Sequence, residues 1–109
     1  MMASKDAKVP QFDGTNYTFW KNKMEYYLMS LGVKVWQSVT DGYKIPSPLP
    51  KNPYGKKEYF ENAKAFNSIA SGLSDSELTK VMGIEISKDT WEKLINFYEG
   101  NDKVKKEKL

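Results

Sequence analysis

Apolar residues recur at steps of three and four near the start of the chain. Tyr17, Trp20, Met24, Leu28 and Leu31 have the spacing of one face of a helix. This pattern predicts a helix over 17–31, with its apolar face turned towards a core and its polar face towards solvent.

The same spacing predicts four more helices. In chain order, their apolar positions are Val33, Val35, Trp36 and Val39 in a short second helix; Tyr59, Phe60, Ala63, Phe66, Ile69, Ala70 and Leu73 in a third that begins near Lys56; Leu78, Val81 and Met82 in a short fourth; and Trp91, Leu94 and Tyr98 in a fifth. Five amphipathic helices with short connections predict an all-α fold, a compact orthogonal bundle. We expect Trp20 and Trp91 to meet in its core.

Residues that cap helices stand at three of the predicted starts. Asn16 precedes the first helix, and Ser87 precedes the apolar positions of the fifth. Ser74 and Glu77 have the spacing of a capping box at the start of the fourth. The predicted helix ends lie at Gly32, Gly83 and Gly100.

Prolines mark two segments that are predicted not to be helical. Between positions 42 and 55, prolines at 46, 48, 50 and 53 predict a surface loop. Near the N-terminus, Pro10 disfavours helix in the residue before it. Residues 9–12 are therefore predicted to form an extended strap that packs against the bundle with Phe12 buried.

The chain of 109 residues has the length of one domain with a single core. Residues 1–8 are polar and are predicted to be a flexible N-terminus, and residues 9–100 to form the helical lobe. Residues 101–109 are predicted to begin a linker or a further helix. Because that last element is incomplete, we expect the chain to be a fragment of a longer protein.

Composition argues against an enzyme. The chain has no Cys and no His, so it lacks thiolate and imidazole metal ligands and the commonest general base. Its glycines stand singly and form no phosphate-binding loop. We predict no catalytic residue, no metal site and no cofactor. No apolar run has the length needed to cross a bilayer, so we expect a cytoplasmic protein without a membrane partner.

The positive charge is concentrated near the C-terminus. The net charge is +3, and residues 1–100 hold 13 Lys against 12 acidic residues, whereas residues 101–109 hold four Lys against two. The chain has no Arg, the residue that most often contacts guanine and phosphate through two parallel hydrogen bonds. We therefore expect RNA binding to be weak and sensitive to salt, and nonspecific RNA binding is the least favoured of three functional hypotheses.

Two aromatic motifs stand near the two ends of the predicted lobe. The first is Phe12-Asp13-Gly14-Thr15-Asn16-Tyr17, followed by Trp20, Met24 and Leu28, and the second is Trp91, Leu94, Tyr98, Glu99 and Gly100. In this order they resemble the N-terminal part of the Gag polyprotein of plant copia-type retrotransposons. There, F-x-G-x-N-Y-x-x-W opens the domain and W-x-x-L-x-x-x-Y-x-G closes its first helical lobe.

The resemblance implies a structural role as a capsid N-terminal lobe. Such lobes pack against copies of themselves into virus-like particles around RNA, and a zinc knuckle further along the polyprotein usually binds that RNA. RNA binding is thus implied to depend on that downstream region. The residues implied as family signature and core are Phe12, Gly14, Tyr17, Trp20, Met24, Leu28, Trp91, Leu94 and Tyr98.

A second hypothesis is a domesticated Gag lobe that binds a short peptide in an apolar groove between helices. Trp36, Tyr43 and Tyr54, in or near the proline-rich segment, are candidates for that interaction surface. The competing explanation is that these rings pack the loop onto the bundle. A second helical lobe and a protease and integrase region after residue 109 would favour the transposon, whereas an early stop would favour domestication.

Overall fold

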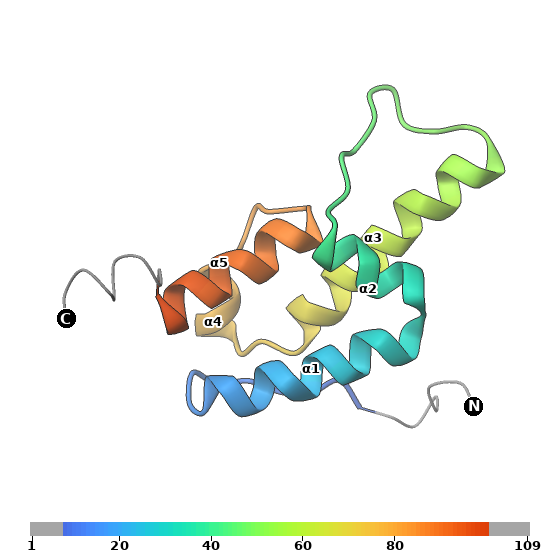
Figure 1. Cartoon of the computed structure of the whole chain (residues 1–109). Helices are drawn as coiled ribbons and strands as arrows, with labels where there is room; N and C mark the ends of the chain where they lie inside the picture. Colours follow the sequence, from blue (N-terminus) through green and yellow to red (C-terminus); the bar gives the residue numbers. More distant parts are fainter. Residues whose placement is uncertain (1–7, 101–109) are drawn as a thin grey trace.

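The computed structural model describes residues 8–100, which form five α-helices (Figure 1). The helices are α1 (Tyr17–Leu31), α2 (Val33–Thr40), α3 (Pro53–Ser71), α4 (Asp75–Thr79) and α5 (Ser87–Glu99). Within the described range there is no strand beyond an isolated bridge between Phe12 and Leu73. The prediction of an all-α bundle is confirmed. Those made for residues 1–7 and 101–109 lie outside the described residues.

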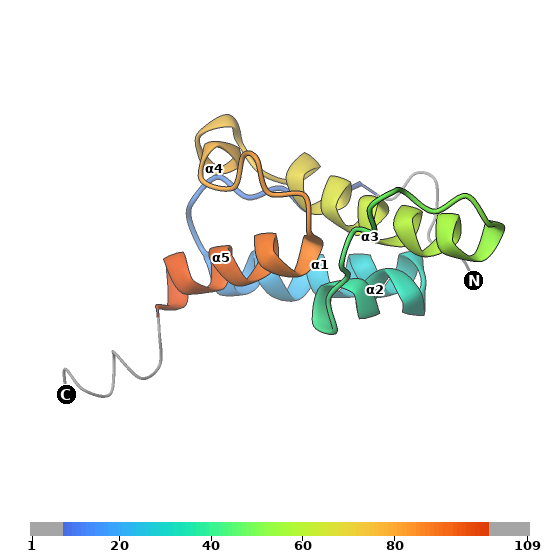
Figure 2. The same ribbon diagram turned by 90° about the horizontal axis from the view of Figure 1, so that it is seen from above.

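The helices bury one core along their apolar faces. α2 and α3 lie at the centre of the bundle, because they contact each other and each of them also contacts α1 and α5. α4 lies at the opposite end of the molecule from the loop that joins α2 to α3 (Figures 1 and 2). The core consists of Phe12, Tyr17, Trp20, Met24, Leu28, Val35, Val39, Ala65, Ile69, Leu73, Val81, Trp91 and Leu94.

The segment before α1 is a strap bound to the chain just after α3. The Phe12 amide donates to the Gly72 carbonyl at 2.7 Å, and the Ser74 amide donates to the Phe12 carbonyl at 3.0 Å. Gly72 is needed here, since a Cβ at this position would lie 2.4 Å from the Pro10 carbonyl oxygen. The strap therefore depends on close backbone contact, and the side chain of Phe12 is 2% exposed.

Helix α1 begins at the predicted residue, but the predicted cap does not form. Asn16 adopts the left-handed conformation, with φ of 57°, and its side chain makes no capping hydrogen bond. Asp13 instead closes the preceding turn, because its carboxylate accepts from the Thr15 amide at 3.0 Å and from the Thr15 hydroxyl at 2.7 Å. Asparagine tolerates the left-handed conformation better than most residues, which explains its presence.

The cap of α5 comes from another helix. Ser87 is the first residue of α5 and is not its cap. Its amide and its hydroxyl both donate to Oδ1 of Asn62 in α3, each at 3.0 Å. The amide of Asn62 also donates to the Glu85 carbonyl at 3.1 Å. The buried Asn62 side chain of α3 thus accepts the hydrogen bond of the first amide of α5. The sequence around α5 does not reveal this partner.

The predicted capping box of α4 does not form. Ser74 is the N-cap residue but makes no side-chain capping bond, and Glu77 is directed to partners in α5. Helix α4 ends at Thr79, so Val81 and Met82, which were predicted inside it, lie in the turns that follow.

Helix α3 begins earlier than predicted, and the loop is correspondingly shorter. Pro53 and Gly55 belong to its first turn, where a proline costs no hydrogen bond because the first amides of a helix have no partner. The Asn52 side chain caps this turn by accepting from the Gly55 amide at 2.6 Å. Figure 1 shows the shortened loop, residues 41–52, extending away from the bundle together with the first turns of α3.

Candidate interaction surface

The two sequence motifs form a single aromatic cluster beneath the strap. The Phe12 ring stacks on Trp20 with a centroid distance of 4.9 Å and meets the edge of Tyr17 at 5.5 Å. Tyr98 of α5 lies 5.0 Å from both Phe12 and Tyr17. The Trp20 indole N–H donates to the Pro10 carbonyl at 3.0 Å. The first and last helices and the strap are therefore joined through these rings.

The remaining signature residues extend this cluster into the core. Trp91 is 5% exposed, and its ring centroid lies 5.9 Å from Trp20 and 6.1 Å from Trp36. Met24, Leu28 and Leu94 are fully buried. Side chains buried within one chain are not available to a partner, so these signature residues account for folding and not for recognition.

A buried ionic cluster fixes the turn into α1. Glu77 is 4% exposed and accepts a hydrogen bond from the Tyr98 hydroxyl. The Lys80 ammonium lies 2.9 Å from the Glu77 carboxylate and donates to the Tyr98 hydroxyl at 2.8 Å. Gly14 passes over this carboxylate with φ of 104°, and a Cβ there would lie 2.9 Å from Glu77 Oε2. Both the conformation and the contact require glycine at position 14.

The environment raises the pKa of three groups at the aromatic cluster, Tyr98, Lys80 and Tyr17. Burial raises the pKa of Tyr98, the hydrogen bond to Glu77 raises it further, and the bond from Lys80 opposes this. Hydrogen bonds to Tyr98 and Glu77 raise the pKa of Lys80. Burial, followed by the charge of Glu99, raises the pKa of Tyr17 far above its usual value, and the Tyr17 hydroxyl has no hydrogen-bond partner within residues 8–100. The cluster thus holds two neutral phenols beside a fixed ion pair.

Sequence reasoning missed the role of Glu77. Its position three residues after Ser74 suggested a helix cap, while its spacing of three from Lys80 is the local signal for an ion pair. The contact with Tyr98 spans 21 residues and depends on the fold.

The outward side of α1 carries large apolar residues among polar ones. Phe19 is 60% exposed, Tyr26 69% and Met29 44%. Positions 19, 26 and 29 fall on the helix face opposite the buried residues Tyr17, Trp20, Met24 and Leu28. We call Phe19, Tyr26 and Met29 the outer stripe. Apart from the Lys23 ammonium, 5.4 Å from the Phe19 ring centroid, no described contact covers these side chains.

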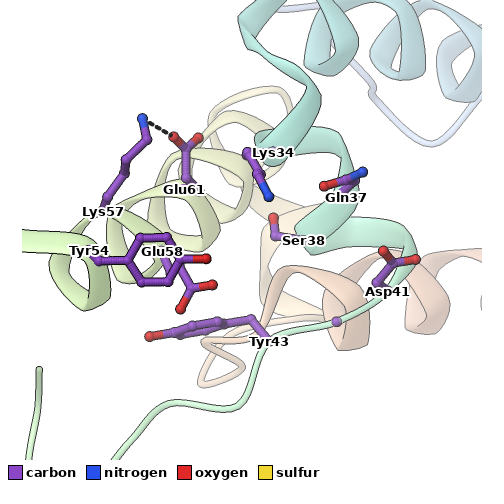
Figure 3. Close-up of a pocket in the computed structure, with 10 residues that line it drawn as sticks. Lys34, Gln37, Ser38, Asp41, Tyr43, Tyr54, Lys57, Glu58 and Glu61 are labelled. Carbon is purple, nitrogen blue, oxygen red and sulfur yellow. Dashed lines mark hydrogen bonds and ion pairs between the residues drawn. The ribbon is translucent and has the colours of Figure 1, made fainter.

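A second candidate surface is a groove between α2 and α3, with a volume of about 190 Å³ (Figure 3). α3 contributes one face, α2 contributes the other, and the segment after α2 closes one end. Its lining residues are Lys34, Gln37, Ser38, Asp41, Gly42, Tyr43, Tyr54, Lys57, Glu58 and Glu61. The groove therefore combines aromatic rings with charges of both signs.

The three aromatic residues expected at an interaction surface do not come together. Tyr43 and Tyr54 line the groove between α2 and α3. Trp36 does not line it and instead packs its ring edge-to-face with Trp91 in the core. The position of Trp36 supports the competing explanation, in which the ring packs within the bundle.

Residues 8–100 contain no group of three metal-ligating side chains close enough to hold an ion. No helix in the same range combines the length and the apolar character that crossing a membrane requires. The chemistry of the described residues is that of packing and surface contact.

Comparison with known families decides the class of the protein. The family model for the gag-polypeptide of LTR copia-type matches residues 24–109. The chain belongs to this family. The match contains the second aromatic motif of this Gag chain and begins at Met24, so the part of the first motif up to Trp20 lies outside it and Met24 and Leu28 lie inside. No curated protein and no solved structure matches the chain. Membership makes this Gag chain a structural, non-catalytic kind of protein.

Proposed function

We propose that this Gag chain is a capsid domain that contributes to the self-assembly of virus-like particles in the cytoplasm, and that the outer stripe of α1 contacts other copies. Family membership supports a structural Gag role. The observation that carries the contact is that α1 is apolar on two opposite faces, although the fold buries one of them. An apolar helix face left in solvent is typical of an interaction site.

The size of the outer stripe indicates a weak contact. A Phe or Tyr side chain can bury about 150–250 Å², so Phe19 and Tyr26, at 60% and 69% exposure, present on the order of 250 Å². Stable complexes bury about 800 Å² per partner. One stripe is therefore too small for a stable dimer. A lattice with several such contacts per chain gains strength from their number.

Sedimentation equilibrium tests this proposal. The chain should be monomeric at micromolar concentration and associate weakly as the concentration approaches millimolar. Replacing Phe19 and Tyr26 together by Ser should abolish the association. Phe60→Ser with Met82→Ser is the matched control, since these side chains are 61% and 68% exposed on other elements. Equal association of the chain and the Phe19/Tyr26 variant would refute the proposed contact, as would equal loss in the control.

A peptide-binding module derived from Gag is the second candidate function. The observation in its favour is that Tyr43 and Tyr54, two of the three residues predicted for such a surface, line one groove. Charged side chains of both signs line the groove beside these rings, so a peptide with a charged group on an apolar stem fits it better than a purely apolar one.

A further inference from the structure

The groove between α2 and α3 has the dimensions of a site for one side chain. Its volume of about 190 Å³ is below the range of about 300–1,000 Å³ that is usual for small-molecule sites. On α3 the lining positions are 54, 57, 58 and 61, and on α2 they are 34, 37 and 38, followed by 41. These spacings place each set on one helix face, so the two faces oppose each other across the groove.

The charges of the groove leave carboxylates unpaired. Lys57 is already bound to Glu61 at 3.3 Å. Asp41 and Glu58 make no ion pair with any described residue, and Lys34 is the remaining cation of the lining. The lining therefore presents two free carboxylates and one free ammonium, a balance that favours a cationic guest.

The aromatic residues stand beside one of these carboxylates. Tyr54 and Glu58 are one helical turn apart on α3, and Tyr54 is 70% exposed. Glu58 is also close enough to Tyr43 that its charge, after burial, raises the pKa of that phenol. The Tyr43 hydroxyl is buried and has no hydrogen-bond partner among the described residues. Figure 3 shows the three side chains at the same end of the groove.

We propose that this end of the groove binds the basic side chain, lysine or arginine, of a partner polypeptide. The cation would lie against the exposed Tyr54 ring, where the face of an aromatic ring attracts positive charge. The Glu58 carboxylate would neutralise it, and the aliphatic stem would cover the Tyr43 ring. The proposed binding site thus consists of two aromatic residues, Tyr43 and Tyr54, and one acidic residue, Glu58. It is separate from the outer stripe of α1.

Titration with a lysine derivative followed by nuclear magnetic resonance tests the site. The probe is Nα-acetyl-lysine-N-methylamide, and its matched control is the norleucine derivative, which has the same stem without the charge. With only about 14 non-hydrogen atoms, the lysine probe should bind with a millimolar dissociation constant. Signals of Tyr43, Tyr54 and Glu58 should shift and saturate with lysine and remain unchanged with norleucine.

Two variants locate the binding. Tyr54→Ala and Glu58→Gln should each weaken lysine binding by about two- to fivefold, whereas Tyr26→Ala, an equally exposed tyrosine on α1, should leave it unchanged. Equal shifts with norleucine would show an apolar groove and overturn the proposal. So would the absence of saturable shifts with lysine, or tighter binding of the corresponding aspartate derivative at Lys34.

Discussion

Both faces of α1 carry large apolar side chains, and the environments of these side chains are opposite. The inner face carries Tyr17, Trp20, Met24 and Leu28, none more than 7% exposed. The outer face carries Phe19, Tyr26 and Met29, each at least 44% exposed. An apolar face of a helix normally indicates the side that packs in the fold. Here that rule accounts for the inner face, and for the outer face we propose contact with other copies of the chain.

The inner face also has a complete set of neighbours within the chain. The strap covers Trp20, α5 supplies Trp91 and Tyr98, and Gly72 allows the strap to approach. The outer stripe has no such neighbours. The comparison predicts that changes on the inner side lower stability and that changes on the outer side leave folding intact.

The largest effect is expected from Trp91→Ala, which removes the ring that packs on the inner face of α1. Because Trp91 is 5% exposed and contacts both Trp20 and Trp36, the cavity should cost about 3–5 kcal/mol. This is a large part of the stability of a small domain. Trp91→Phe should cost less, since it keeps most of the apolar area. Urea unfolding measures both, and an unchanged midpoint for the alanine variant would move Trp91 to the surface residues.

Gly72→Ala should have the next largest effect. The φ of Gly72 is −85°, which any residue adopts, so its cost arises from contact with the Pro10 carbonyl at 2.4 Å and with the end of Met24 at 2.9 Å. We expect a loss of about 1–3 kcal/mol and faster hydrogen exchange of the Phe12 amide. In Gly83→Ala a Cβ meets no atom within 4 Å. The Gly83→Ala control should lower the stability of the domain only through backbone strain at position 83. Hydrogen exchange of the Phe12 amide should then speed up no more than the overall loss of stability explains.

Alkaline pH should destabilise the inner side through its tyrosines. In the folded chain the pKa values of Tyr17 and Tyr98 are raised above the usual value of about 10 for a tyrosine. Above pH 10 the unfolded chain therefore loses phenol protons that the folded chain keeps, so the free energy of unfolding falls as pH rises. Tyr17→Phe removes a buried hydroxyl without a partner. It should be at least as stable at pH 8 and show a shallower alkaline decline, and a decline as steep as that of the parent chain would disprove the assignment.

The smallest effect on stability is expected from the outer stripe. Phe19→Ser and Tyr26→Ser remove rings that are 60% and 69% exposed, so each should change the free energy of unfolding by no more than about 0.5 kcal/mol. Thermal unfolding gives the comparison with Trp91→Ala directly. A loss as large as that of a core substitution would mean that the stripe packs within the chain.

Periodicity was sufficient to predict the helices but not what fixes their ends. α1 has the predicted bounds and α3 begins only a few residues before its predicted start, because the apolar positions repeat clearly in both. The predicted capping residues were wrong where the actual hydrogen-bond partner is distant in sequence. Asn62 serves the start of α5 from α3, and Glu77 bonds to Tyr98 instead of capping α4. Local sequence contains no signal for either contact.

The candidate surfaces were less predictable than the core for a physical reason. An exposed apolar residue and a buried one look alike in a helical pattern, so Phe60 and Met82 were assigned to apolar faces although they are 61% and 68% exposed. Tyr43 and Tyr54 could be singled out by their place near the prolines, but their shared groove depends on how α2 and α3 pack. The ion pair of Lys57 with Glu61 spans four residues of α3 and is a local helix contact, whereas the place of Glu58 beside Tyr43 depends on the fold.

The central claim is that the outer face of α1 contacts other copies of this Gag chain while its inner face holds the fold together. Amide and methyl spectra recorded from micromolar to millimolar concentration test it most directly, because weak association moves the signals of the residues in contact. The account predicts concentration-dependent shifts at Phe19, Tyr26 and Met29, with Trp20 and Trp91 unchanged. Shifts confined to another surface, or none at any position up to millimolar concentration, would contradict it.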